Sequence, residues 1–131
     1  MNPDADEERD ATASLLFDAA RRSAAYLGGL DRRSVPPSPT AVADLARLEM
    51  PLPEAPTDPA AVLAELDALV APATMATAGP RFFGFVIGGT LPAALAANWL
   101  AAAWDQNAAM ASVTPGVAQV EAIALRWIVE V

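Results

Sequence analysis

The sequence predicts a mainly α-helical fold for this portion of the chain. Helix-start signals recur along it, apolar residues follow helical spacing over several stretches, and the strongest run of strand-favouring residues is short. A hydroxyl or carboxylate residue directly before a proline is a typical helix start, because its side chain accepts from the first free N–H groups and proline fits the first turn. The pairs Ser38–Pro39, Asp58–Pro59 and Thr114–Pro115 all have this form.

The first helix is expected from about Glu7 to Leu27. Acidic residues crowd its first turn, where the helix dipole favours negative charge, and Gly28 and Gly29 end it. Its apolar positions recur at helical spacing and predict an amphipathic helix that docks on a partner surface. These positions are Leu16, Ala19, Ala20, Ser23, Tyr26 and Leu27.

Two further helices follow proline-rich connectors. Ser38–Pro39 opens a short helix over residues 41–48, and the segment MPLPEAPTDP then interrupts the helical pattern. Asp58–Pro59 begins a third helix, whose apolar stripe runs to Pro72.

The stretch 81–107 contains 23 consecutive residues without a charge. Its aromatic and β-branched cluster, residues 82–87, favours extended structure, and the following Gly88–Gly89 allows a turn or a close backbone approach. A helix is then expected from Thr90 through Asp105, which is too short and too rich in alanine for a membrane span of about 20 residues. A buried helix is therefore preferred over a membrane span. The last helix begins at Thr114–Pro115.

The composition excludes several functional classes. The 131 residues fit one domain, and their net charge of −8 includes eight arginines and no lysine. Without a basic stripe, nucleic acid is not an expected partner, and an acidic surface is repelled by anionic lipid headgroups. The chain has no cysteine and no histidine, so thiolate chemistry is removed and no metal site is expected. The acidic N-terminus is not an export signal, and a cytoplasmic location is expected.

Charge is concentrated in the first part of the chain. Residues 79–131 carry five of the 24 charged side chains. A free-standing domain normally covers itself with charged residues, so this portion is expected to be covered by other protein. The last residues, EAIALRWIVEV, stop within a helical pattern, and the chain is expected to be a piece of a longer protein.

An ordered set of residues in the second half resembles a known family. The run PRFFGF at residues 80–85 is followed in order by Gly88, Gly89, Pro92, Trp99, Asn107, Pro115 and Glu121. This order resembles the signature of the pyridoxal-phosphate-dependent group II amino-acid decarboxylases, which include the aromatic-amino-acid, glutamate and histidine decarboxylases. Gly79 stands where that family usually has histidine, and Thr114 stands where it usually has serine.

The resemblance implies a type I aminotransferase-like α/β fold in an obligate dimer. Residues 1–80 would form an N-terminal helical segment that lies across the partner subunit of a homodimer. Residues 81–131 would be the first strand-like stretch and helices of the large pyridoxal-phosphate-dependent domain. The implied activity is removal of the α-carboxylate of an amino acid as carbon dioxide, with the cofactor ring as electron sink.

No residue of this chain is expected to be catalytic or to bind the cofactor. Pyridoxal 5′-phosphate needs a lysine that holds it covalently, and the chain has none, so the cofactor would belong to the full-length protein and the 131 residues alone would be inactive. The resemblance does imply contacts with the amino-acid substrate, from the loop after PRFF and from a helix end near the neighbouring subunit. The implied residues are Phe85, Val86, Ile87, Gly88, Gly89, Asn107 and Ala109.

Other interpretations remain open on residue types alone. Residues 85–89 also fit a strand with a turn that packs in a core, and the polar residues before Asn107 fit an ordinary helix end. If the loop does line a pocket, Phe85, Val86 and Ile87 favour an aromatic or aliphatic amino acid over glutamate. The alternative function is a non-catalytic helical interaction protein or dimerisation module.

Overall fold

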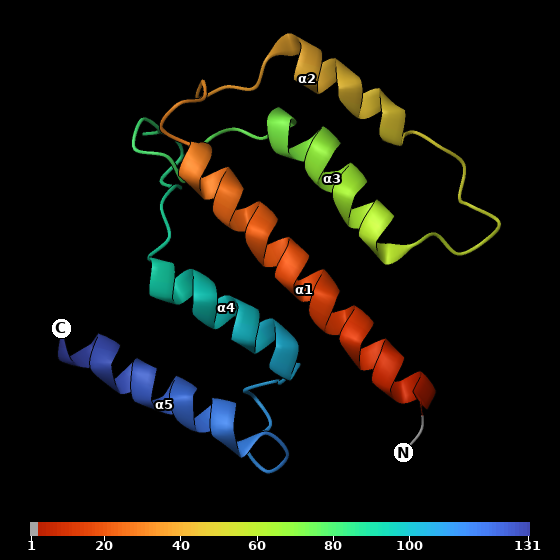
Figure 1. Ribbon diagram of the computed structural model, residues 1–131. Helices are drawn as coiled ribbons and strands as arrows, with labels where there is room; N and C mark the ends of the chain where they lie inside the picture. Colours follow the sequence, from red (N-terminus) through yellow and green to blue (C-terminus); the bar gives the residue numbers. More distant parts are fainter. Residues whose placement is uncertain (1–2) are drawn as a thin grey trace. The chain divides into compact units, whose positions relative to one another are not determined.

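A computed structural model describes residues 3–131, and these residues are mainly helical, as the sequence predicts (Figure 1). No strand occurs within this range. The elements are α1 (Pro3–Gly29), α2 (Pro39–Asp44), the 3₁₀ turn η1 (Leu45–Leu48), α3 (Pro59–Ala73), α4 (Pro92–Trp104) and α5 (Pro115–Glu130).

Two of the predicted helix starts are confirmed in atomic detail, and one works differently. The Ser38 side chain accepts from the Ala41 N–H at 3.1 Å, and the Asp58 carboxylate accepts from the Ala60 N–H at 3.1 Å. Thr114 makes no such cap bond at the start of α5. Its buried hydroxyl instead donates to the carbonyl oxygens of Asn107 and Met110, which closes the preceding loop.

The prediction of a strand-like stretch at residues 82–87 is wrong. Phe85 and Val86 have left-handed backbones, with φ of 57° and 54°, and the Ile87 N–H donates to the Gly84 carbonyl at 3.2 Å. These residues therefore form a tight turn. Aromatic and β-branched residues favour strands only where a neighbouring strand pairs with the backbone, and the described chain offers none.

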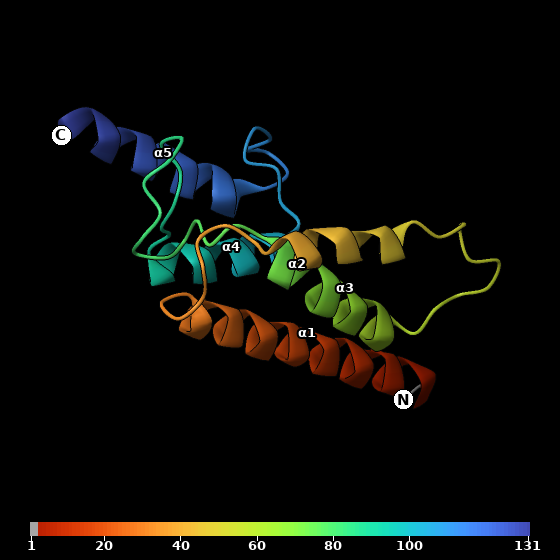
Figure 2. The same cartoon turned by 90° about the horizontal axis from the view of Figure 1, so that it is seen from above.

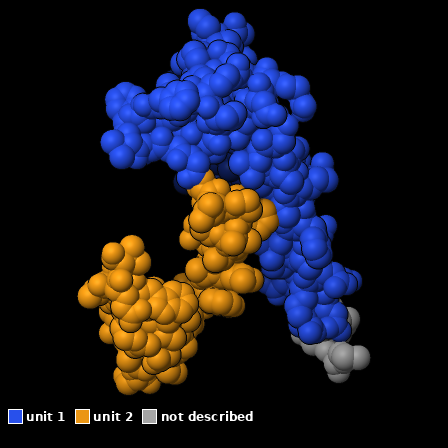
Figure 3. Space-filling model, turned by 90° about the vertical axis from the view of Figure 1, so that its left-hand side faces the viewer, with its two compact units in different colours: residues 1–89 blue, residues 90–131 orange. Residues whose placement is uncertain are grey.

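The described chain divides into two compact units, residues up to Gly89 and residues 90–131, which Figure 3 colours separately. In the first unit, α3 contacts both α1 and α2, and Figures 1 and 2 both show it beside them. The buried apolar residues of this unit are Leu30, Leu69 and Ala76. Residues 90–131 are all described, and Thr114 is the only one of them that is buried.

The uncharged stretch contains a short helix, α4, in which no residue is buried, so the expected burial does not occur within the described chain. α4 has 13 residues, and among residues 3–131 no helix combines the length and hydropathy needed to cross a membrane.

An ion-pair network joins α1 to α3. The Arg22 guanidinium donates to Asp18 at 2.7 Å on its own helix and to Asp67 of α3 at 2.9 Å, and Arg21 also pairs with Asp18. All three members of the Arg22 pairs are partly shielded from solvent. The hydrogen bond from Arg22 lowers the pKa of Asp18 below its ordinary value, and the bond to Asp18 raises the pKa of Arg22.

A second polar cluster, formed by Tyr26, Arg33 and Thr74, holds the C-terminal end of α3. The Arg33 guanidinium donates to the carbonyl oxygens of Ala71 at 3.1 Å, Pro72 at 3.2 Å and Thr74 at 2.7 Å. It also lies over the Tyr26 ring, 5.3 Å from the centroid, and the Tyr26 hydroxyl is 2.9 Å from the Thr74 hydroxyl. A cation at a helix C-terminus complements both the unpaired carbonyl groups and the helix dipole.

Acid should remove the contribution of Asp18 to stability. Because the folded pKa lies below the ordinary value of 3.8, this contribution is present above that value and is lost as the pH falls through the folded pKa. Asp18→Asn should therefore be less stable than the unmodified chain at pH 7, and the difference should shrink below about pH 4. Urea unfolding followed by circular dichroism at a series of pH values measures it. Asp10→Asn removes a carboxylate from the same helix outside the recorded ion pairs and should show no such pH-dependent difference.

Loss of the Arg33 fork should destabilise the first unit. Arg33→Ala removes three charge-assisted hydrogen bonds and should cost about 1–3 kcal/mol of unfolding free energy. Arg33→Lys should recover only part of this, because an ammonium lacks the planar fork. Arg32→Ala, which removes one bond from an exposed side chain to Gly28, is the matched control and should change stability by about 0.5 kcal/mol or less. Equal losses for Arg33→Ala and Arg32→Ala would contradict this role.

Candidate functional site

The predicted substrate-contacting residues 85–89 lie together on one loop of the first unit, organised around the Phe82 ring. A Cβ atom added to Gly84 would lie 3.1 Å from this ring, and one added to Gly88 would lie 3.2 Å from the ring and 2.4 Å from the Thr77 carbonyl oxygen. Gly88 also has a φ of 121°, which side chains rarely allow. Glycine is therefore required at position 88 by both space and backbone conformation.

The same loop presents three apolar side chains to solvent. Phe83, Phe85 and Val86, here called the apolar knuckle, are all strongly exposed, Phe85 at 85% and Val86 at 106%. A left-handed backbone costs an L-residue roughly 1–2 kcal/mol, and here two such residues are adjacent. The knuckle is thus both apolar and strained, and it is available for contact with another molecule.

Asn107 and Ala109 lie together on the loop between α4 and α5, in the second unit. The Asn107 carboxamide oxygen accepts from the Ala109 N–H at 3.0 Å, and its backbone carbonyl accepts from Met110 and Thr114. This arrangement is an Asx-type turn, in which the Asn side chain shapes its own loop. The Asn107 side chain thus has a structural task here, and a substrate contact would require it to use its remaining N–H groups.

The residues of this chain do not fit a covalently held pyridoxal phosphate. The sequence has no lysine and no histidine, and the loop of residues 85–89 presents apolar side chains. Within residues 3–131 there is also no group of three metal-ligating side chains.

The sequence predicts one apolar face on α1. In the structure the apolar residues of this helix lie on two sides, one half-buried and one exposed. The half-buried side carries Arg22, which bonds to Asp67 of α3, and Tyr26, which bonds to Thr74 at the end of α3. Leu16 and Leu27, expected on the same face, are exposed, and so are Phe17 and Ala13 beside them. We call Ala13, Leu16, Phe17 and Leu27 the exposed α1 face. Apolar residues around more than half of the helix circumference were the sequence signal for this second surface.

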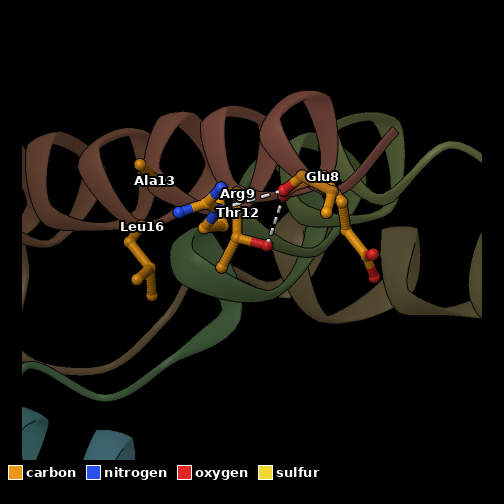
Figure 4. A pocket seen from close by; sticks show the side chains of 6 residues that line it. Glu8, Arg9, Thr12, Ala13 and Leu16 are labelled. Atoms are coloured by element: carbon orange, nitrogen blue, oxygen red, sulfur yellow. Dashed lines mark hydrogen bonds between the residues drawn. The ribbon is translucent and has the colours of Figure 1, made fainter. Parts of the chain in front are cut away.

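A shallow groove runs along the N-terminal part of the exposed α1 face (Figure 4). Its volume is about 490 Å³, and Leu16 and Ala13 form its apolar end, as Figure 4 shows. Thr12 and Arg9, whose side chains bond to the α1 backbone, lie beside them. A second groove of about 620 Å³ lies between α1 and the start of α3 and carries the carboxylates of Glu8, Asp18 and Asp58.

The second unit is also poorly covered. Large apolar side chains of α4 and α5 are exposed, and this agrees with the low charge of residues 79–131. They include Trp99, Leu100, Trp104, Val120, Leu125, Trp127, Ile128 and Val129. An apolar surface of this extent is typical of a protein–protein contact.

Comparison with known proteins finds no matching family model, no matching curated protein and no matching solved structure.

Substitution of Gly88 should disrupt the loop. Gly88→Ala places a Cβ against the Thr77 carbonyl oxygen and forces an unfavourable φ, so it should lower the unfolding free energy by more than about 2 kcal/mol. Gly28→Ala is the matched control, since Gly28 lies in α1 with nothing near its added Cβ. That variant should be about 0.5–1 kcal/mol more stable than the unmodified chain. Urea unfolding measures both, and similar stabilities of the two variants would show that the loop tolerates a side chain.

Proposed function

We propose that this chain is the N-terminal portion of a pyridoxal-phosphate-dependent amino-acid decarboxylase, in which it holds two subunits together and contributes to the substrate pocket. The observation that carries the proposal is the ordered set that begins with PRFFGF at residues 80–85 and continues through Gly88–Gly89 to Asn107 and Glu121. The remainder of the protein would complete the aminotransferase-like α/β fold and supply the lysine that holds the cofactor.

The exposed α1 face supports a homodimer through the N-terminal helices. Its Leu16 and Phe17 side chains stand in solvent near the middle of a 27-residue helix, where burial against a second copy would remove apolar surface from water. Charge also differs along this segment. Residues 6–10 hold four acids and one arginine, whereas residues 21–33 hold four arginines and one acid. Arg21 and Arg22 lie on α1 itself, so an antiparallel pair of α1 helices would bring the acidic end of one helix toward these two arginines of the other.

The knuckle loop supports a role in binding the substrate. Phe85 and Val86 are exposed and apolar, which fits the side chain of an aromatic or aliphatic amino acid better than that of glutamate. Gly88 and Gly89 have positive φ and no Cβ, so their backbone can approach a ligand closely. Asn107 and Ala109, together with the loop they shape, would contact the pocket of the neighbouring subunit.

A second candidate function is a non-catalytic helical dimerisation module. The observation that favours it is the absence of lysine and histidine from the sequence, together with extensive exposed apolar surface. Both candidates use the exposed α1 face for assembly. They differ in whether the full-length protein releases carbon dioxide.

One pair of variants tests both assembly and activity. Leu16→Glu should convert a dimer of the full-length protein into monomers, because it buries a charge in the proposed seam. Met50→Glu is the matched control, since Met50 is exposed to the same extent, 60%, but lies outside α1. It should leave the dimer intact. Analytical ultracentrifugation measures the assembly.

Activity of the same proteins separates the two candidates. The unmodified full-length protein and Met50→Glu should release carbon dioxide from an aromatic or aliphatic amino acid, and Leu16→Glu should lose this activity with its dimer. A dimer that releases no carbon dioxide from any amino acid would favour the dimerisation module. An unmodified protein that stays monomeric, or a dimer unaffected by Leu16→Glu, would rule out the α1 seam.

A further inference from the structure

The Gly84–Ile87 turn contains residues that rarely occur in such a conformation. Its two central positions, Phe85 and Val86, both have positive φ, and the Ile87 N–H closes the turn on the Gly84 carbonyl. Turns with positive φ at both central positions normally use asparagine, aspartate or glycine there. A β-branched residue such as Val86 is the least suited, because its side chain crowds the backbone.

The surroundings do not compensate for this conformation. The Phe85 and Val86 side chains are exposed, so neither gains free energy from burial. Strained backbone persists where neighbouring structure determines it. The neighbours found here lie against the flanking glycines, where the Phe82 ring packs near Gly84 and Gly88 and the Thr77 carbonyl packs near Gly88. The turn is therefore held by a single backbone hydrogen bond and by contacts at its ends.

The local sequence also prefers a different conformation. All of residues 82–87 except Gly84 are aromatic or β-branched and favour extended backbone, which conflicts with the turn at Phe85 and Val86. Such conflicts between local preference and structure are expected at strained or functional positions. Gly88 and Gly89 follow directly, and Gly89 combines the wide φ range of glycine with open space around its Cα.

We infer that the Gly84–Ile87 turn is a two-state element. The closed state is the left-handed turn, and in the open state Phe85 and Val86 return to extended backbone and the Ile87–Gly84 hydrogen bond is broken. Successive side chains of extended backbone point to opposite sides, so the open state lets one of the pair pack on the protein while the other contacts a ligand. This last step rests on the proposed function, because it makes the open state the one that lines the substrate pocket.

Hydrogen exchange of the Ile87 amide in the 131-residue chain tests the two states. Val86→Asn should favour the closed state, since asparagine tolerates a left-handed backbone, whereas Val86→Thr is a polar, β-branched control that retains the strain. We expect the Ile87 amide to exchange about tenfold more slowly in Val86→Asn than in Val86→Thr. The Ala76 amide, bonded to the Val35 carbonyl at 2.9 Å, should exchange equally in both variants. Equal exchange of Ile87 in the two variants would overturn the two-state element.

The same variants in the full-length protein test the open state as the binding state. Because Val86→Asn favours the closed turn, its KM for an aromatic amino acid should be about tenfold above that of Val86→Thr. If the Ile87 exchange differs but the KM values are equal, the turn has two states and the open state has no part in binding. If the unmodified full-length protein releases no carbon dioxide, the proposed function fails, and the exchange measurement still decides whether the turn has two states.

Discussion

The fork of hydrogen bonds from Arg33 to the end of α3 determines how the first unit holds together. The Arg33 guanidinium donates to three carbonyl groups and lies over the Tyr26 ring of α1. The backbone carbonyl of Arg33 accepts from Arg81 at the start of the knuckle loop. The end of α1, the end of α3 and the start of the knuckle loop thus meet at one residue. With few buried apolar residues nearby, directional polar contacts carry an unusual share of the task of fixing these segments.

The small number of buried apolar residues also explains why many apolar side chains are exposed. A helix with apolar residues on two sides can bury only one of them against a single neighbour, and α3 takes the side of α1 that carries Tyr26. Leu16 and Phe17 are left in solvent as a result. The helices of the second unit, α4 and α5, are exposed in the same way, and Thr114 makes its buried contacts with polar backbone groups. Both units therefore leave apolar side chains in solvent that a self-sufficient domain normally buries.

The sequence was informative where structure depends on neighbouring residues. Ser38 and Asp58 start helices because a short polar side chain followed by proline acts within one turn, and the expected helices appear close to their expected bounds. Prediction failed where the backbone conformation depends on residues that are distant in sequence. The left-handed turn at Phe85–Val86 arose in a segment with strong strand preference, because strands need partners that this chain does not place there.

The candidate site shows the same division. The grouping of residues 85–89, and of Asn107 with Ala109, follows from their proximity in sequence, so both groups could be named in advance. The sequence could not predict that Gly88 depends on the Thr77 carbonyl. It also could not predict the bonds of Arg33 to the end of α3, whose partners lie about forty positions away. The second apolar side of α1 was visible in composition but could be separated from the first only once α3 was in place.

The division of the chain near Gly89 has a consequence for biosynthesis. Every contact that joins α1, α2 and α3 lies within residues that are synthesised before α4 and α5. The N-terminal unit can therefore assemble while α4 and α5 are still being made, as domains generally do during translation.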